Sequence, residues 1–228
     1  MTTTGGAKAP HAFCIGLQNR LCRLKHRLFT ADHNSQGTCL CPGLPAWEAL
    51  KDCAGQFATA ETLPMGRLID YPADWGTPGA DRMTGLQLPF KAVPAGSEGA
   101  LITEIRASTE KKSPLLITFW QPHWAMSADV VQFVDLPVGE AACFEDPAWG
   151  PNPNAVNDCD FAPSRIFKAS WSGLADKWPA AAEFLTNYQL SVEDQQPLMG
   201  QIDVDGQSVE EAVAAWMAAN EATWKPVV

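Results

Sequence analysis

The sequence feature that most limits the possible folds is an unbroken apolar run, Leu115-Leu116-Ile117-Thr118-Phe119-Trp120, which directly follows a proline. Six residues is a usual strand length, and a strand that lacks alternating polar residues must be buried on both faces. Strands of this kind belong to mostly parallel sheets that are covered by helices. The run therefore predicts an α/β protein.

The segments on either side of this run alternate between strand and helix patterns, as an α/β fold requires. We expect strands at 66–71, 90–93, 130–136 and 166–169. We expect helices at 45–57, 78–85, 97–112, 174–178, 179–188, 192–200 and 209–219. Three helix starts are explicit: Thr77 precedes Pro78, Ser97 is a good N-cap, and Ser208 with Glu211 forms a capping box.

Residues 1–41 differ from the rest of the chain. They hold five basic residues and one acidic residue and show neither helical nor strand periodicity. No apolar stretch of a signal peptide follows the basic residues. We expect 1–41 to be an atypical, poorly specified N-terminal segment that packs poorly on the remainder, and a stable basic arm is the alternative. The regular pattern starts at residue 42.

Composition narrows the function. The formal net charge is −10 and the sequence pI is about 4.8, which argues against a nucleic-acid partner because phosphates would be repelled. The chain has 9 Trp but only 2 Tyr, and Trp is the best ring for holding a cation against its face. The same residue also fills cores well. The Trp residues at helix positions are interpreted as packing: Trp47, Trp171, Trp178, Trp216 and Trp224.

Motifs for enzymatic chemistry are missing from the sequence. G-x-S-x-G, H-E-x-x-H, G-x-G-x-x-G and the P-loop pattern do not occur, so we expect neither an enzyme nor a cofactor. Cys39, Cys41 and Cys53 with His33 do not have the spacing of a zinc site, so no metal is expected. His123 follows a proline at a strand end and is interpreted as a satisfied polar group.

Several ordered motifs carry a family resemblance. The buried run ends in Phe119-Trp120-Gln121-Pro122-His123-Trp124, and the tail holds Phe167-Lys168-Ala169-Ser170-Trp171, Pro179-Ala-Ala-Ala-Glu-Phe184-Leu185 and Glu210-Glu-Ala-Val-Ala-Ala-Trp216. Together they resemble the glycine betaine class of substrate-binding proteins that serve ABC importers. Gly43-Leu44-Pro45-Ala46-Trp47-Glu48-Ala49-Leu50 and Asp146-Pro147-Ala148-Trp149-Gly150 are similar to a branch that includes binders of betaine, choline and trimethylamine N-oxide.

The resemblance implies a two-lobed fold of the type II periplasmic-binding-protein kind, with mostly parallel sheets and the first lobe incomplete. Residues 42–125 would form the ligand-binding second lobe, and 126–228 would return to form part of the first lobe. The partners it implies are a small zwitterionic or cationic ligand and the membrane permease of an ABC importer. It also implies a periplasmic or other extracytoplasmic location, although no signal peptide is visible in this sequence.

The ligand residues follow from the resemblance one motif at a time. Trp75 and Trp120 would be two walls of a tryptophan cage around a quaternary ammonium, and the backbone N–H groups of Gly76 and Thr77 would bind a ligand carboxylate. Relatives often have Gly-Trp-Gly-Cys at the first of these places, whereas this chain has Asp74-Trp75-Gly76-Thr77. The departure from the family pattern therefore lies in the part of the site that would bind the ligand carboxylate. Trp124 and Trp149 could either border the cleft or hold a loop.

Physical chemistry is consistent with these assignments. A quaternary ammonium cannot donate a strong hydrogen bond, so a protein holds it with ring faces. The start of the helix after Thr77 would offer N–H groups and a positive dipole end to an anion. Trp120 ends its strand, and open α/β sheets bind ligands at the carboxyl ends of their strands.

Cys143 and Cys159 flank the Asp146–Gly150 motif in a segment rich in proline and asparagine. A bond between them would order this segment, and the compartment implied by the resemblance permits disulfides. We therefore expect a disulfide with its Cα atoms within about 7 Å. Two readings of function remain: a quaternary-ammonium binding protein, or a truncated remnant of the same family that binds no ligand and acts as an interaction module.

Overall fold

The computed structural model describes residues 11–16, 41–127, 130–162 and 167–227. The chain divides into two compact units. Unit 1 comprises Met1–Trp120 and Asp129–Pro163, and unit 2 comprises Gln121–Ala128 and Ser164–Val228. Each unit is described by itself below.

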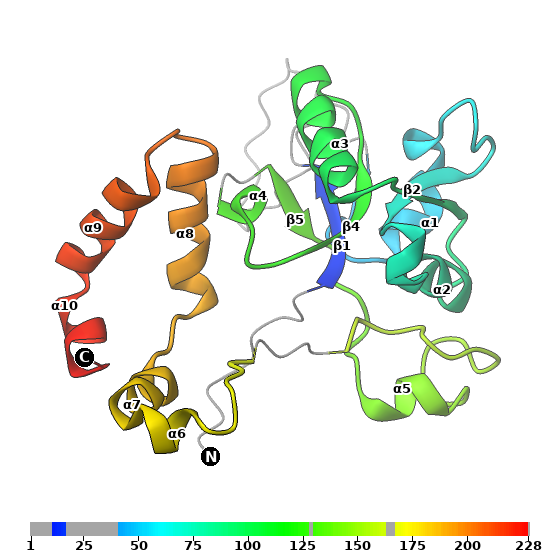
Figure 1. The fold of residues 1–228 in the computed structure, drawn as a ribbon. Helices are drawn as coiled ribbons and strands as arrows, with labels where there is room; N and C mark the ends of the chain where they lie inside the picture. The colour runs from blue at the N-terminus through cyan, green and yellow to red at the C-terminus, as the bar shows by residue number, and fades with distance from the viewer. Residues whose placement is uncertain (1–10, 17–40, 128–129, 163–166, 228) are drawn as a thin grey trace, which may run out of the picture. The chain divides into compact units, whose positions relative to one another are not determined.

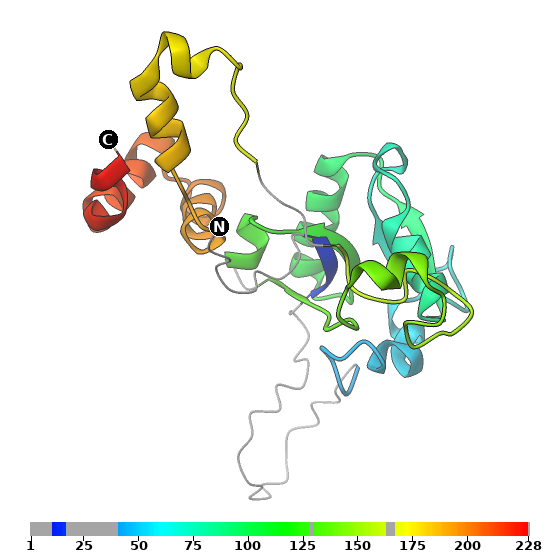
Figure 2. The ribbon, with the colours of Figure 1, turned by 90° about the horizontal axis from the view of Figure 1, so that it is seen from below.

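Unit 1 is built on a five-stranded sheet in the order β3-β2-β4-β1-β5. Its strands are β1 (His11–Gly16), β2 (Gly66–Asp70), β3 (Phe90–Pro94), β4 (Leu116–Trp120) and β5 (Val131–Phe133). β2 is parallel to both β3 and β4, whereas β1 runs antiparallel to both β4 and β5. The connections can be followed in Figures 1 and 2.

The helices of unit 1 connect or flank these strands. They are α1 (Ala49–Cys53), the 3-10 helices η1 (Ala54–Phe57) and η2 (Ala73–Trp75), α2 (Pro78–Gly85), α3 (Glu98–Lys111) and α5 (Ala141–Glu145). α2 joins β2 to β3 and α3 joins β3 to β4. Because parallel crossovers are right-handed and these two run in opposite directions across the sheet, α2 and α3 cover opposite faces.

The core of unit 1 confirms the expected role of the apolar run. Four consecutive residues of β4, from Leu116 to Phe119, are fully buried. Leu116 packs in one cluster with Leu68 of β2, Phe90 of β3 and Trp47. Burial on both faces explains why the run contains no alternating polar residues. The predicted bounds of α2 are reproduced, and Ser97 caps α3 by accepting a hydrogen bond from the N–H of Ala100 at 3.2 Å.

Residues 11–16 do not fit the expectation that the N-terminal segment 1–41 packs poorly on the rest of the chain. His11–Gly16 forms β1, which lies between β4 and β5 in the sheet. Local sequence gave no strand signal there, since this strand is defined by pairing with segments more than a hundred residues away. The rest of the segment, residues 1–10 and 17–40, lies outside the described residues.

The division into units also differs from the expected boundary at residue 125. The chain enters unit 2 at Gln121 and returns to unit 1 for 129–163. β5 adds a strand beside β1, and the segment after it is held on α2. That segment therefore belongs with the sheet. The expected strand at 166–169 is not formed by 167–169, and residue 166 is not described.

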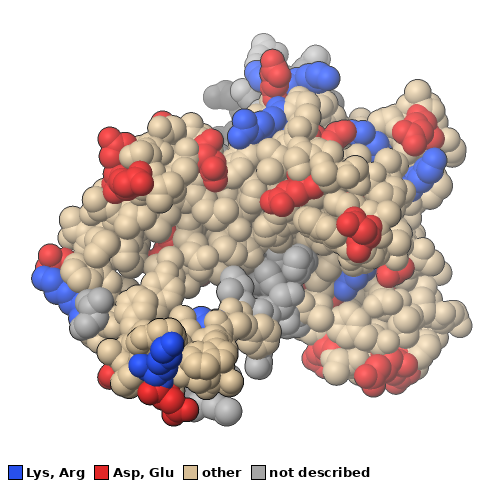
Figure 3. All heavy atoms as spheres, viewed as in Figure 1, with Lys and Arg blue, Asp and Glu red and all other residues tan. Residues whose placement is uncertain are grey.

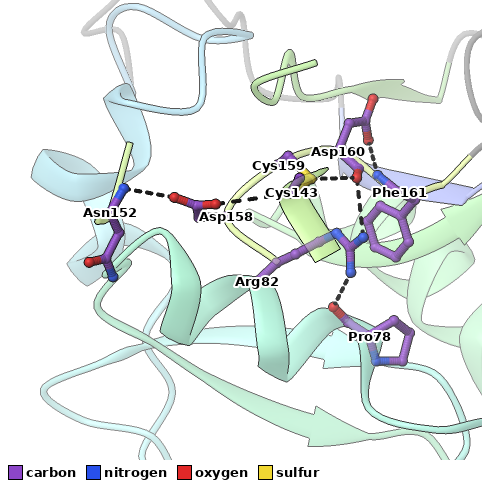
Figure 4. Close-up of a disulfide and its surroundings, with 8 residues drawn as sticks. All are labelled: Pro78, Arg82, Cys143, Asn152, Asp158, Cys159, Asp160 and Phe161. Carbon is purple, nitrogen blue, oxygen red and sulfur yellow. Dashed lines mark hydrogen bonds between the residues drawn. A yellow bond between two sulfur atoms is a disulfide. The ribbon is translucent and has the colours of Figure 1, made fainter. Parts of the chain in front are cut away.

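The segment that returns to unit 1 is anchored by a buried arginine of α2 (Figure 4). Arg82 is 4% exposed, and its guanidinium donates to the carbonyl oxygens of Pro78 (3.0 Å) and Asp160 (3.2 Å). It also lies over the ring of Phe161, 3.7 Å from the centroid. Burial lowers the pKa of Arg82 to about 10, against the opposing effect of Asp160, Asp81 and Asp70, so it stays charged at neutral pH.

Two disulfides join described residues of unit 1. Cys143 and Cys159, the pair expected from the sequence, are bonded with a Cα–Cα distance of 6.4 Å (Figure 4). Cys41 and Cys53 form a second bond, with a Cα–Cα distance of 5.4 Å, which the sequence had not predicted. All four residues are buried, and this second bond holds the segment before α1 against the end of that helix.

Unit 2 is helical. It contains α4 (Trp124–Ser127), α6 (Leu174–Lys177), α7 (Pro179–Asn187), α8 (Val192–Asp203), α9 (Val209–Ala219), α10 (Glu221–Trp224) and η3 (Lys225–Val227). The predicted capping box of α9 is present: Ser208 Oγ accepts from the N–H of Glu211 at 3.2 Å, and the Glu211 carboxylate accepts from the N–H of Ser208 at 3.0 Å. The Ser208 hydroxyl, which donates to the Glu211 carboxylate at 2.8 Å, lowers the pKa of Glu211, and the N–H of Ser208 adds to this effect.

The helices of unit 2 leave large apolar side chains exposed, in contrast to the buried sheet of unit 1. Trp171 is 60% exposed and Trp178 is 51% exposed, so the packing expected of both is on the surface and not in a core. Their rings meet edge to face, with centroids 6.4 Å apart. Phe167 and Phe184 are exposed as well. Charged side chains, by comparison, lie in small scattered groups on the face shown in Figure 3.

We predict that replacing both Cys143 and Cys159 by Ser lowers the free energy of unfolding by about 3 kcal/mol, because the bond closes a loop with a sequence separation of 16. Urea denaturation followed by circular dichroism measures the difference. A reducing agent should destabilise the unsubstituted protein more than the double variant. Equal effects of the reducing agent on both would mean that the Cys143–Cys159 bond does not contribute to stability, which would contradict the prediction.

Candidate functional site

Three aromatic rings meet at the carboxyl ends of β2 and β4. Tyr71 directly follows β2, Trp75 ends η2, and Trp120 ends β4. The ring centroids are 5.6 Å apart for Tyr71 and Trp75, and 6.1 Å apart for both of the other pairs. The interplanar angles lie between 55° and 62°, so the rings are tilted against one another rather than stacked. We call this group the ring trio.

Parallel pairing of β2 with β4 is what brings these rings together. Leu68 pairs with Leu116 and Ile69 with Ile117, so the two strands end side by side. A short turn after β2 then places Trp75 beside both ends. The structure thus groups Trp75 and Trp120 and adds Tyr71, which the sequence analysis missed. Its position directly after a strand was visible in the sequence, but the adjacency of that strand to β4 was not.

The rings of the trio differ in exposure. Tyr71 is 5% exposed and forms the floor, Trp120 is half-buried, and Trp75 is 49% exposed. Trp120 is also held from below by Phe119, whose ring stacks on it at 4.3 Å and 23°. Large half-exposed aromatic side chains beside a buried ring offer π faces to a ligand while their other sides are fixed by protein.

The centroid distances show that the three rings pack against one another, so a ligand would lie against the outer faces of the trio and not between its rings. Cation–π attraction operates over a ring face within about 6 Å of the centroid.

The start of α2 differs from the sequence expectation. Thr77 occupies the N-cap position, but its side chain makes no capping hydrogen bond. Asp70, the last residue of β2, takes that role: its carboxylate accepts from the N–H groups of Gly79 (3.2 Å) and Ala80 (3.0 Å). A cap supplied from a neighbouring strand cannot be recognised from local sequence, which is why Thr77 was selected instead.

This arrangement bears on the N–H groups of Gly76 and Thr77, which were predicted to bind a ligand carboxylate. The N–H of Gly76 donates to Ala73 O at 3.3 Å within the turn, and Gly76 has φ 99°, a conformation that favours glycine. Among the described residues, the N–H of Thr77 has no acceptor. Because Asp70 already lies at the positive end of α2, that helix end does not provide a vacant anion site.

The two further tryptophans occupy other places. Trp149 is half-buried in the loop after α5, and its N–H donates to Asp146 O at 3.1 Å. Trp124 is 7% exposed and belongs to α4 of unit 2, with its ring 5.2 Å from that of His123. Neither ring belongs to the ring trio, and a ligand contact of Trp124 or Trp149 stays a prediction.

His123 is a buried neutral imidazole. It is 5% exposed, and its Nδ1 accepts a hydrogen bond from the N–H of Ala125 at 3.2 Å, so the proton of the ring lies on Nε2. Burial lowers its pKa to about 4, against a small opposing effect of Asp203 on α8. This agrees with the interpretation of a satisfied polar group. Among the described residues, no cluster of three or more His, Cys, Asp or Glu is arranged to hold a metal.

Comparison with known proteins identifies the family. Residues 37–219 match the family described as the substrate binding domain of an ABC-type glycine betaine transport system. The chain belongs to this family, whose members are extracytoplasmic, non-enzymatic components of transporters. None of the helices in the described part of the chain has the length and apolar character needed to span a bilayer.

Two curated relatives are similar over most of the chain. A trimethylamine N-oxide-binding protein from Pelagibacter ubique is 30% identical over 82% of this chain, and a glycine betaine/carnitine transport binding protein from Listeria monocytogenes is 25% identical over 68% of it. These matches span 59% and 48% of the relatives' own lengths. The chain therefore corresponds to about half of each relative or slightly more.

Solved structures show the same fold. A lactococcal glycine betaine-binding protein in its closed, liganded form matches with a TM-score of 0.51 at 16% identity, covering 96% of this chain and 66% of its own. A choline binding protein in complex with choline matches with a TM-score of 0.52 at 15% identity, covering 97% of this chain and 63% of its own. The chain has the fold of type II periplasmic binding proteins, as the motifs had implied.

We predict that acid destabilises the fold through His123. Its pKa is lowered in the folded state, so the unfolded chain binds a proton more readily, and stability is complete above about pH 6.5 and falls as the pH drops toward 4. Between pH 7 and pH 5 the expected loss is about 2 kcal/mol. Chemical denaturation at both pH values measures it. His123→Asn keeps a hydrogen-bond acceptor and should remove most of this loss, and an unchanged loss in that variant would contradict the assignment.

Proposed function

We propose that this chain is the solute-binding component of an ABC importer and binds a quaternary-ammonium osmolyte, glycine betaine or a similar compound, with the ring trio. The observation that carries the proposal is the meeting of Tyr71, Trp75 and Trp120 at adjacent parallel strand ends. Open α/β sheets bind ligands at this edge. The relatives that bind trimethylamine N-oxide, glycine betaine and carnitine support the same ligand class.

The cationic end of the ligand is the better supported half. Three ring faces can contact a methylated cation without hydrogen bonds, and each is worth roughly 0.5–2 kcal/mol depending on desolvation. A carboxylate at the other end would have to use the N–H of Thr77, since Asp70 takes the first amides of α2 and Gly76 is engaged by Ala73. The arrangement therefore favours choline or trimethylamine N-oxide, which have no carboxylate, over glycine betaine.

A second candidate is an interaction module that binds no ligand, and one observation favours it. Unit 2 exposes Phe167, Trp171, Trp178 and Phe184, and apolar surface of this kind marks contact regions in soluble proteins. Light scattering coupled to gel filtration separates the two candidates. Self-association that Trp178→Ala abolishes, with no ligand binding at any concentration, would favour the second.

Calorimetric titration tests the first candidate. Glycine betaine, choline, carnitine, proline betaine and trimethylamine N-oxide form the panel, and proline serves as a control that lacks a quaternary ammonium. At least one compound of the panel should bind and proline should not. If none binds, the proposal fails for this chain.

We predict that Trp75→Ala and Trp120→Ala each weaken binding by about 1–3 kcal/mol, or roughly 5–150-fold, through lost cation–π attraction and lost apolar contact. Trp75→Phe should give a smaller loss because a weaker π face remains. Trp178→Ala is the matched control, since Trp178 is 51% exposed and Trp75 is 49% exposed. Unchanged affinity in both Trp75→Ala and Trp120→Ala would exclude the ring trio as the ligand site.

A further inference from the structure

Asp70 has an unusual position for a carboxylate. It is the last residue of β2, is 2% exposed, and accepts three backbone hydrogen bonds: from Tyr71 (2.9 Å), Gly79 (3.2 Å) and Ala80 (3.0 Å). A buried carboxylate is tolerated only when such partners replace its water. All three donors are backbone groups, so the side chain fixes the course of the chain itself.

These hydrogen bonds close the two ends of one short segment. Tyr71, the first donor, is the first residue of the connection between β2 and α2. The other two donors, Gly79 and Ala80, lie in the first turn of α2, at the far end of this connection. Trp75 lies between them, in η2. The turn that carries Trp75 is therefore tied to the end of β2 on both sides by a single carboxylate.

The start of α2 can lie this close to the Asp70 carboxylate because Gly79 has no side chain. A Cβ atom on Gly79 would collide with the Asp70 carboxylate and would lie 2.6 Å from Thr118 Oγ1. Thr118 is fully buried on β4, two residues before Trp120. The first turn of α2 is thus seated directly against the two strands whose ends carry Tyr71 and Trp120.

We propose that Asp70 is the positioning residue of the ring trio: by capping α2 from the end of β2 it sets the place of Trp75 relative to Tyr71 and Trp120. The inference rests on the proposed function for its effect on ligand affinity. Asp70 acts through Trp75 and does not have to touch the ligand. The Trp75 ring contacts those of Tyr71 and Trp120 and is otherwise 49% exposed, and its backbone N–H donates to Pro72 O at 2.8 Å within the turn that Asp70 ties down.

The test is Asp70→Asn, which removes the charge at the helix start and leaves one acceptor oxygen of two. Binding of choline, trimethylamine N-oxide and glycine betaine is measured by titrating the methyl resonances of each in NMR, which reaches millimolar affinities. We expect affinity to fall about 2–30-fold, since the loss in binding cannot exceed what the cap contributes to holding the turn. In a Trp75→Ala background the same change should alter affinity less than about twofold, because the ring that it positions is absent.

Asp158→Asn is the matched control. Asp158 is also a buried carboxylate, 1% exposed, and accepts a backbone N–H from Asn152 at 2.7 Å, but it orders the loop after α5. It should lower stability without changing affinity. If Asp158→Asn weakens binding as much as Asp70→Asn does, the effect is general destabilisation and the proposal is wrong. It is also wrong if Asp70→Asn weakens binding equally with and without Trp75.

Hydrogen exchange provides a readout that needs no ligand. In Asp70→Asn the amides of Gly79 and Ala80, which donate to this carboxylate, should exchange at least about tenfold faster, while those at the start of α3, capped by Ser97, should not change. If the unsubstituted protein binds none of the three compounds, the proposed function fails, and exchange at Gly79 and Ala80 still decides whether Asp70 holds the turn. Unchanged exchange there would overturn the inference.

Discussion

Parallel pairing between β2 and β4 is the interaction on which the candidate site depends. β4 is buried along Leu116–Phe119, so its pairing register with β2 is fixed by the core rather than by exposed residues. Once the two strands are in register, their carboxyl ends must lie together, and Tyr71 and Trp120 become neighbours as a consequence. The stability of the sheet and the geometry of the ring trio therefore have one common cause.

Electrostatics adds a constraint that the sheet alone does not impose. The N-terminal end of α2 attracts an anion, and a substrate carboxylate could have used it. In this chain Asp70 lies there, so the favourable interaction stabilises the protein rather than a ligand. If the ring trio is the ligand site, the same carboxylate that caps α2 also occupies the helix end nearest to the rings, so capping and the choice of ligand would depend on one side chain.

The limits of sequence reasoning follow from the range of each interaction. The buried run at 115–120 and the helices at 78–85 and 209–219 could be predicted because periodicity and caps are local. Asp70 as a cap, β1 as a middle strand and the Cys41–Cys53 bond could not, because each depends on a residue brought near by the fold. Tyr71 illustrates both cases. Its position directly after a strand can be read from local sequence, but its contact with Trp120 depends on how the strands pair. Exposure of Trp171 and Trp178 was missed because helical spacing predicts a face and not what covers it.

The ring trio and the exposed surface of unit 2 are separate properties of the chain. Tyr71, Trp75 and Trp120 all belong to unit 1, and so does Asp70, so the contacts that would hold a methylated cation do not depend on how the two units are arranged. The exposed side chains of Phe167, Trp171, Trp178 and Phe184 belong to unit 2, and the relatives, of which this chain spans 59% and 48%, have additional residues that could cover such a surface. If the ring trio of unit 1 is the ligand site, contacts from those residues would add affinity to it. A ligand that binds this chain weakly and a complete relative tightly would reflect that difference in contact area and not a different binding chemistry.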